Sequence, residues 1–183
     1  MEVRIHRILT GSRANGPGIR NVVWFQGCTL RCPGCFNPQT HAPHGGQSIN
    51  VEELCDRMLS PYHPCDGITI SGGEPFQQAE ALLNLLQELR KHKAPSILVF
   101  SGYSYNELRN NPVSAACLPF IDALICGPYD RKTPPVYERF CSSGNQELVL
   151  LSERYTENDF RNLPVMEYFF DDSGNVIISG INS

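Results

Sequence analysis

The chain reads Val22-Val-Trp-Phe-Gln-Gly-Cys28-Thr-Leu-Arg-Cys32-Pro-Gly-Cys35 where an apolar run leads directly into three cysteines. The apolar run predicts a buried strand, and the loop after it carries the cysteines with the spacing C-x3-C-x2-C. Three thiolates so close together suit three corners of an iron–sulfur cube, although cube-type clusters normally take four cysteines. The spacing therefore predicts a cluster with one iron that has no protein ligand and is open to a small molecule.

A zinc site is the structural alternative for the same cysteines. Tetrahedral zinc takes four ligands, and His41 or His44 could complete a Cys3His set. Structural zinc normally stabilises small domains, whereas a chain of 183 residues can bury about 70% of its unfolded surface without a metal. We favour the cluster, and we interpret each histidine taken alone as a solvated loop residue.

Composition and charge limit the classes of protein to which the chain can belong. Hydrophobic residues make up 41% of the chain and charged residues 19%, and the net charge of −4 provides no basic surface for nucleic acid or an anionic membrane. The first residues lack the apolar stretch of a secretory signal, and no apolar segment approaches the roughly 20 residues that span a bilayer. We expect one domain, residues 1–183, in the cytoplasm.

Eight cysteines could also indicate a secreted disulfide scaffold. Because no export signal precedes them, a reducing compartment with metal-binding thiols is the better interpretation. Cys55, Cys117 and Cys126 sit among apolar residues, which predicts small core residues. Cys65 and Cys141 fall in loop-like sequence, and Cys141 is more simply an incidental loop cysteine than a reactive thiol.

Strand-like and helix-like segments alternate along the chain. The expected strands are 22–26, 68–71, 97–100, 121–125 and 147–151, and the expected helices are 51–59, 78–92, one that begins at Ser104, and 156–162. This alternation predicts parallel pairing with right-handed crossovers. Five or six such units are too few for an eight-fold barrel, so we predict a partial, open parallel β/α barrel. The turn-rich segment 171–175, between apolar runs 165–170 and 176–178, predicts a C-terminal β-hairpin.

Unusual sequence follows the carboxyl ends of four expected strands. After the cysteine loop come Ser71-Gly-Gly-Glu-Pro75, Ser101-Gly-Tyr103 and Gly127-Pro-Tyr129. Ligands of parallel α/β proteins bind at these ends of the strands, so we expect the four loops to converge on one site. Residues 127–146 show no helical or strand period, and we expect them to form a lid or a partner-facing loop there.

Together these motifs resemble the radical S-adenosylmethionine (SAM) superfamily, which is marked by C-x3-C-x2-C followed by a Gly-Gly-Glu segment. Asn15-Gly-Pro-Gly-Ile-Arg20 and Ser142-Ser-Gly-Asn-Gln146 narrow the resemblance to the activating proteins of anaerobic ribonucleoside-triphosphate reductases, over residues 15 to 150. The resemblance implies an oxidoreductase in which a reduced [4Fe-4S] cluster cleaves SAM to a 5′-deoxyadenosyl radical. That radical would take a hydrogen atom from a glycine of a partner enzyme.

The resemblance also implies cofactor-binding residues and partners. The implied cluster ligands are Cys28, Cys32 and Cys35, and the implied SAM contacts are Gly34, Phe36, Gly72, Gly73, Glu74, Ser101, Asn145 and Gln146. Gly72, Gly73 and Glu74 would meet the methionine amino group, and Gly34 and Phe36 would lie near the nucleoside. The partner would be a glycyl radical enzyme, here anaerobic ribonucleotide reductase, and the electron donor a protein such as flavodoxin or ferredoxin.

Two departures from the family pattern bear on the function. Asn15 stands where related proteins commonly carry Asp in a loop thought to face the partner, and Cys141 replaces an expected glycine in a segment one residue longer than usual. The alternatives are a small radical SAM enzyme for a metabolite or peptide, and a zinc-stabilised binding module or electron carrier. A lid formed by residues 127–146 would favour the metabolite enzyme, and a mouth rimmed by Arg20 and the 15–20 loop would favour the activating protein.

Overall fold

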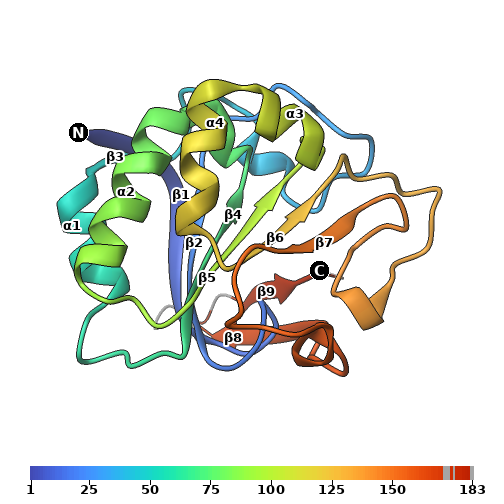
Figure 1. The fold of residues 1–183 in the computed structure, drawn as a ribbon. Helices are drawn as coiled ribbons and strands as arrows, with labels where there is room; N and C mark the ends of the chain where they lie inside the picture. The colour runs from blue at the N-terminus through green and yellow to red at the C-terminus, as the bar shows by residue number, and fades with distance from the viewer. Residues whose placement is uncertain (171–173, 175, 182–183) are drawn as a thin grey trace.

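The computed structural model describes residues 1–170, 174 and 176–181, and its centre is a seven-stranded sheet with the helices on one face (Figure 1). The strands are β1 (Glu2–Ser12), β2 (Arg20–Phe25), β3 (Gln47–Asn50), β4 (Gly67–Gly72), β5 (Ile97–Ser101), β6 (Ala123–Cys126) and β7 (Glu147–Leu150), in the order β3-β1-β2-β4-β5-β6-β7. Strands β2, β4, β5 and β6 pair in parallel. The predicted open α/β architecture is confirmed, and the strands that the structure describes do not close into a barrel.

Both edges of the sheet are antiparallel, which the alternation of the sequence did not predict. β1 and β3 extend the sheet beside β2, and β7 pairs antiparallel with β6 at the other edge. β3 contains a single apolar residue, Ile49, which lies opposite Val3 of β1. Such a strand has no periodic signal of its own, because its partner strand supplies the hydrogen bonds that define it.

Three of the four α-helices in the described part of the chain begin at a residue whose side chain caps them. The helices are α1 (Val51–Met58), α2 (Ala79–Lys91), α3 (Tyr105–Asn110) and α4 (Pro112–Cys117), and α2 begins without such a cap. Asn50 caps α1, and Ser104 forms the predicted capping box with Glu107 at the start of α3. The expected helix over 156–162 is instead a short 3₁₀ turn, Glu157–Phe160, and α4 was not predicted. In the described part of the chain, no helix has both the length and the apolarity needed to cross a membrane.

Apolar side chains pack on both faces of the sheet. The larger cluster lies between the sheet and the helices and includes Cys55, Cys117 and Cys126, so the prediction that these are core residues is confirmed. A second cluster on the opposite face contains Phe140 and Cys141. Burial raises the pKa of Cys141 to about 11, so its thiol is not activated as a nucleophile.

A two-stranded antiparallel sheet follows, formed by β8 (Met166–Phe170) and β9 (Val176–Gly180). It lies on the side of the main sheet away from the helices (Figure 1). The predicted C-terminal hairpin is therefore confirmed, while most of the expected turn over 171–175 lies outside the described residues.

Arg20 is fully buried at the amino end of β2. Its guanidinium donates to the hydroxyl oxygens of Thr69 at 3.0 Å, Ser96 at 2.7 Å and Tyr155 at 2.7 Å, and to the carbonyl of Ile68. The cysteine loop follows the opposite end of β2. Arg20 therefore does not rim the mouth of the site, so it does not distinguish the activating protein from the metabolite enzyme; its side chain instead joins β2 to β4, Ser96 and Tyr155.

Replacing Arg20 by Lys is expected to lower the free energy of unfolding of the metal-free chain by about 2 kcal/mol, because an ammonium cannot reach all of these acceptors at once. Urea denaturation measures the difference. Arg13→Lys is the matched control, since Arg13 is exposed and lies in the loop between β1 and β2. Equal stability of the Arg20→Lys and Arg13→Lys variants would contradict the structural role.

Candidate functional site

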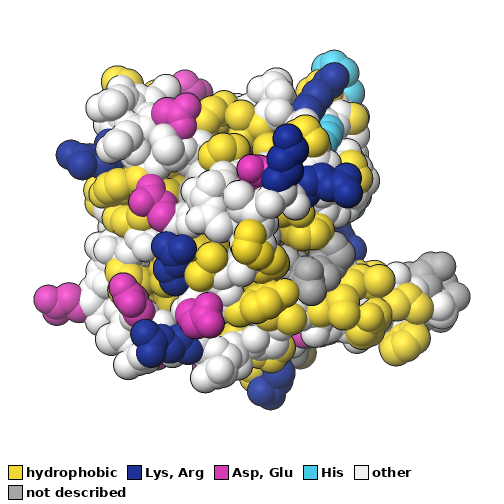
Figure 2. Space-filling model, turned by 90° about the vertical axis from the view of Figure 1, so that its right-hand side faces the viewer, with side chains coloured by type: hydrophobic (Ala, Val, Ile, Leu, Met, Phe, Trp, Pro, Cys, Tyr) yellow, Lys and Arg dark blue, Asp and Glu magenta, His cyan; other side chains and the backbone are white. Residues whose placement is uncertain are grey.

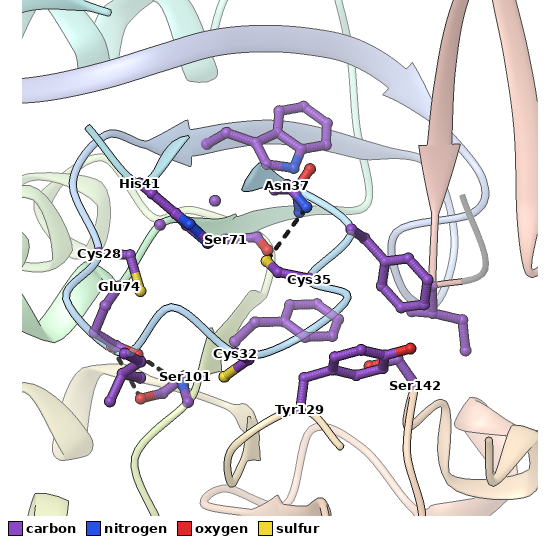
Figure 3. Close-up of a pocket in the computed structure, with 18 of the residues that line it drawn as sticks. Cys28, Cys32, Cys35, Asn37, His41, Ser71, Glu74, Ser101, Tyr129 and Ser142 are labelled. Atoms are coloured by element: carbon purple, nitrogen blue, oxygen red, sulfur yellow. Dashed lines mark hydrogen bonds between the residues drawn. The ribbon is translucent and has the colours of Figure 1, made fainter. Parts of the chain in front are cut away.

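The loops after β2, β4, β5 and β6 converge on one pocket, as the sequence predicted. The pocket is lined by residues from all four loops, among them Cys28, Cys32, Cys35, Phe36, Ser71, Gly72, Gly73, Glu74, Ser101, Gly102, Gly127 and Tyr129. Figure 3 shows the three cysteines around this pocket, with Glu74 and Ser101 on one side and Tyr129 on another. Side chains from segments up to about a hundred residues apart in sequence therefore share one chemical environment.

Each of the three cysteines is a free, half-buried thiol. Burial raises the pKa values of Cys28 and Cys35, and backbone N–H groups oppose this shift at both sulfurs. The amide of Asn37 donates to Sγ of Cys35 at 3.4 Å. Such N–H donors stabilise metal-bound thiolates. Three thiols that line one pocket, two of them with backbone N–H donors beside the sulfur, fit a [4Fe-4S] cluster.

The two glycines at the end of β4 allow a close backbone approach, but the backbone that they approach belongs to Phe25 of β2 and to Gly27. A Cβ atom on Gly72, whose φ is +108°, would lie 2.4 Å from the amide nitrogen of Phe25, and one on Gly73 would lie 2.3 Å from the carbonyl oxygen of Gly27. The amide of Gly73 donates to the carbonyl of Phe25 at 2.8 Å. The glycines therefore join the end of β4 to the start of the cysteine loop.

Glu74 is buried in the pocket wall, where its carboxylate links two loops. It accepts hydrogen bonds from Oγ of Ser101 at 2.9 Å and from the amides of Phe76 at 3.0 Å and Gly102 at 2.7 Å. Burial raises the pKa of Glu74 to about 7, although these three donors oppose the rise. The carboxyl group can therefore exchange a proton near neutral pH.

The far wall of the pocket is aromatic and amide-lined. The rings of Phe36 and Tyr129 meet with centroids 4.8 Å apart. The side-chain oxygen of Gln146 accepts from the amide and Oγ of Ser142 at 3.0 and 2.8 Å, and its amide donates to the carbonyl of Gly127 at 3.2 Å. Gln146 thus holds two segments of the 127–146 loop together at the pocket.

The structure places most, but not all, of the predicted SAM contacts in this pocket. Those that line it are Phe36, Gly72, Gly73, Glu74, Ser101 and Gln146. Gly34 lies outside the lining, where a Cβ would meet the side chain of Arg131 at 2.9 Å. Asn145 is exposed and accepts a hydrogen bond from Oγ1 of Thr133 at 3.3 Å.

The pocket residues that were not predicted include Arg7, Trp24 and His41. The guanidinium of Arg7 lies 4.5 Å from the ring centre of Trp24. His41 also lines the pocket, so it is not a solvated loop residue, whereas His44 is exposed as expected. Within the part of the chain that the structure describes, Nε of Arg7 and Nε2 of His41 are buried without a hydrogen-bond partner. Recognition of β1 would have been needed to place Arg7; the alternation of apolar Val3 and Ile5 with polar neighbours is the signal that could have identified that strand.

Asn15 also lines the pocket, and its side chain is hydrogen-bonded to the C-terminal hairpin. Its side-chain amide donates to Oγ of Ser12 and of Ser179, both at 2.7 Å. The carboxylate of Glu167 accepts from the amide of Arg13 at 2.9 Å and also lies 3.5 Å from the amide nitrogen of Asn15. An aspartate at position 15 would lack these donors and would face a second carboxylate, which explains the asparagine.

A profile of the family described as "4Fe-4S single cluster domain" matches residues 14–149. The chain belongs to this family. It is 30% identical over 153 residues to the anaerobic ribonucleoside-triphosphate reductase-activating protein of Salmonella typhimurium strain LT2, covering 79% of this chain and 96% of that protein. The protein of the same description from Enterobacteria phage T4 is 30% identical over 148 residues, covering 78% of this chain and 90% of the relative.

The chain is also similar to longer proteins. It is 41% identical over 106 residues to the pyruvate formate-lyase-activating enzyme of Clostridium pasteurianum, covering 56% of this chain and 44% of that enzyme. The chain thus matches less than half the length of such relatives. Membership of the family confirms the predicted resemblance and the predicted cofactors, a [4Fe-4S] cluster and SAM, and it overturns the zinc interpretation.

Asn15→Asp is expected to lower the free energy of unfolding of the metal-free chain at pH 8 by about 2 kcal/mol, because a buried carboxylate would then oppose Glu167. Adding Glu167→Gln should recover about 1 kcal/mol of this loss by removing the repulsion. A double-mutant cycle in urea measures the coupling. Strictly additive effects of the two substitutions would rule out the proposed pairing.

Glu74 should make stability depend on pH. Its pKa of about 7 in the folded chain lies above the ordinary value of 4.5. The folded state therefore binds the proton more tightly, and its stability decreases as pH rises from about 4.5 to 7. Relative to Glu74→Gln, the free energy of unfolding of the metal-free wild type should fall by about 3 kcal/mol across this window and stay level above it. A pH-independent difference would contradict the raised pKa.

Proposed function

We propose that this protein is a radical SAM activating enzyme that generates a glycyl radical on a partner, anaerobic ribonucleoside-triphosphate reductase. One observation carries the proposal. All eight cysteines lie in described residues, and the pocket is lined by Cys28, Cys32 and Cys35 alone among them. A [4Fe-4S] cluster held there would have one iron without a cysteine ligand, next to the Gly72–Glu74 wall.

The cluster would be held by the three cysteines, and when reduced it supplies the electron that cleaves SAM to methionine and a 5′-deoxyadenosyl radical. The residues of the chain bind and orient the reactants. Glu74 can accept a hydrogen bond from the methionine ammonium group, since each carboxylate oxygen has more than one lone pair. Phe36 and Tyr129 provide an aromatic surface for the nucleoside. The apolar and aromatic walls exclude water from the radical.

The choice of partner is supported by the relatives that this chain matches along nearly their whole length. These are the proteins described as activating anaerobic ribonucleoside-triphosphate reductase, with 90% and 96% of each relative covered. We propose that the chain works as a single domain in the cytoplasm, where clustered thiols stay reduced. Its electron donor would be a low-potential protein such as flavodoxin or ferredoxin.

Anaerobic reconstitution with iron and sulfide should yield a brown protein that dithionite bleaches. With SAM it should release 5′-deoxyadenosine, and with the reductase it should produce a glycyl radical signal in electron paramagnetic resonance. Changing Cys28, Cys32 or Cys35 to Ala should reduce 5′-deoxyadenosine to background, because each removes a cluster ligand.

Cys55→Ala is the matched control, because Cys55 is buried in the helix-facing core and does not line the pocket. It should retain the colour and the 5′-deoxyadenosine release of the wild type. A colourless zinc-loaded protein, or unchanged turnover in Cys32→Ala, would refute the proposal. Release of 5′-deoxyadenosine with a metabolite or peptide, and with no radical on any reductase, would refute the choice of partner.

A further inference from the structure

The outer face of the C-terminal hairpin carries a continuous set of exposed apolar side chains. We call this set the hairpin patch, and its members are Met166, Tyr168, Phe170, Val176 and Ile178. They lie on one face because β8 and β9 alternate and pair Tyr168 with Ile178 and Phe170 with Val176. The hairpin projects from the body of the molecule, and the described side chains on it are mainly hydrophobic (Figure 2).

This exposure is unusual for large apolar side chains. Phe170 is 75% exposed, Tyr168 56% and Ile178 44%. An apolar patch on a protruding strand pair favours aggregation unless another surface covers it. The members of the patch include no charged side chain, since Glu167 points to the other face and is bonded to the 12–15 loop. The outer face of the hairpin is therefore built for contact with another apolar surface.

The inner face of the hairpin fixes it firmly to the domain. Glu167 accepts from the amides of Arg13 and Ala14 at 2.9 and 3.3 Å, and Ser179 accepts from Asn15 at 2.7 Å. An isolated two-stranded hairpin is marginal in water, so these bonds determine its orientation. Because the hairpin is held in this way, a protein that binds its outer face is placed at a defined position relative to the 12–15 loop.

The hairpin patch is continuous with the pocket. Ile178 belongs to both, and Ser179, Gly180 and Ile181 also line the pocket that contains the three cysteines. Arg7 reaches from the pocket to the carbonyl of Ile178 at 3.5 Å. Whatever covers the outer face of the hairpin therefore lies directly beside the pocket opening.

We propose that the hairpin patch is the docking surface for the partner reductase, inserting into an apolar groove beside the loop that carries the reactive glycine. This inference rests on the proposed function. A glycine inside a folded protein must be delivered to the pocket by contacts outside it, and a projecting apolar arm at the pocket edge supplies them. Aromatic anchors such as Tyr168 and Phe170 are typical of the residues that dominate interface energies. A metabolite needs no such surface.

The test compares wild type, Tyr168→Ser/Phe170→Ser/Val176→Ser and Tyr62→Ser as reconstituted holoproteins; Val176 is chosen because it belongs to the hairpin patch and does not line the pocket. Tyr62 is an exposed aromatic residue, 88% accessible and outside the pocket, so it controls for loss of surface hydrophobicity. Three quantities are measured: 5′-deoxyadenosine released without partner, the rate of glycyl radical formation against the concentration of the full-length anaerobic ribonucleoside-triphosphate reductase from the same organism, and the oligomeric state of each variant in solution. Tyr168→Ser alone provides a second variant should the triple variant fail to fold.

The triple variant should release 5′-deoxyadenosine as wild type does, while its KM for the reductase rises about tenfold or more and the limiting rate changes little. Tyr168→Ser should raise KM about threefold, and Tyr62→Ser should match wild type. Wild-type KM in the triple variant would overturn the docking role, as would loss of self-association without a change in KM, since the patch would then bind a second copy of this chain. A wild type that cleaves SAM but never forms a glycyl radical would instead overturn the proposed function, and the inference with it.

Discussion

The backbone contact between the ends of β2 and β4 is the constraint on which the site depends. At the start of the cysteine loop, the backbone amide of Gly73 donates to the carbonyl of Phe25, and the backbone amide of Glu74 donates to the carbonyl of Gly27. Any side chain at Gly72 or Gly73 would collide with that backbone. The same contact places the Glu74 carboxylate at the pocket wall, where it accepts hydrogen bonds from the hydroxyl of Ser101 and the amide of Gly102 at the end of β5. The cysteine loop, the turn at Gly72–Glu74 and the loop after β5 are thus held together by a short series of hydrogen bonds.

Local sequence was sufficient to predict the part of the molecule in which local physics decides the structure. The four parallel strands are short apolar runs, and each is followed by a loop rich in glycine, proline or cysteine, so both the strands and the shared pocket were predictable. Asn50 and Ser104 marked helix starts because a side-chain oxygen can satisfy the free N–H groups there. The cysteines identified the chemistry because their spacing has few other uses.

The rest depended on contacts between distant segments. β3 exists because β1 pairs with it, and Arg20 is buried because Ser96 and Tyr155, more than seventy residues away, accept its hydrogen bonds. The 12–15 loop enters the pocket because Glu167 and Ser179 of the hairpin bind it. None of these partners can be chosen from periodicity, since each polar residue alone reads as an ordinary surface position.

The two ends of the parallel strands differ in whether their buried polar side chains have hydrogen-bond partners. At the amino end, each nitrogen of the buried Arg20 guanidinium donates to an acceptor within the protein, so this group needs no ligand to complete its hydrogen bonds. At the carboxyl end, Nε of Arg7 and Nε2 of His41 are buried with no hydrogen-bond partner among the residues that the structure describes. Unpaired buried polar atoms are costly, and native proteins retain them where a ligand completes the bonding. The same end carries the three cysteines, so the unpaired atoms and the thiols are two independent observations that support the site proposed for the cofactor and the substrate.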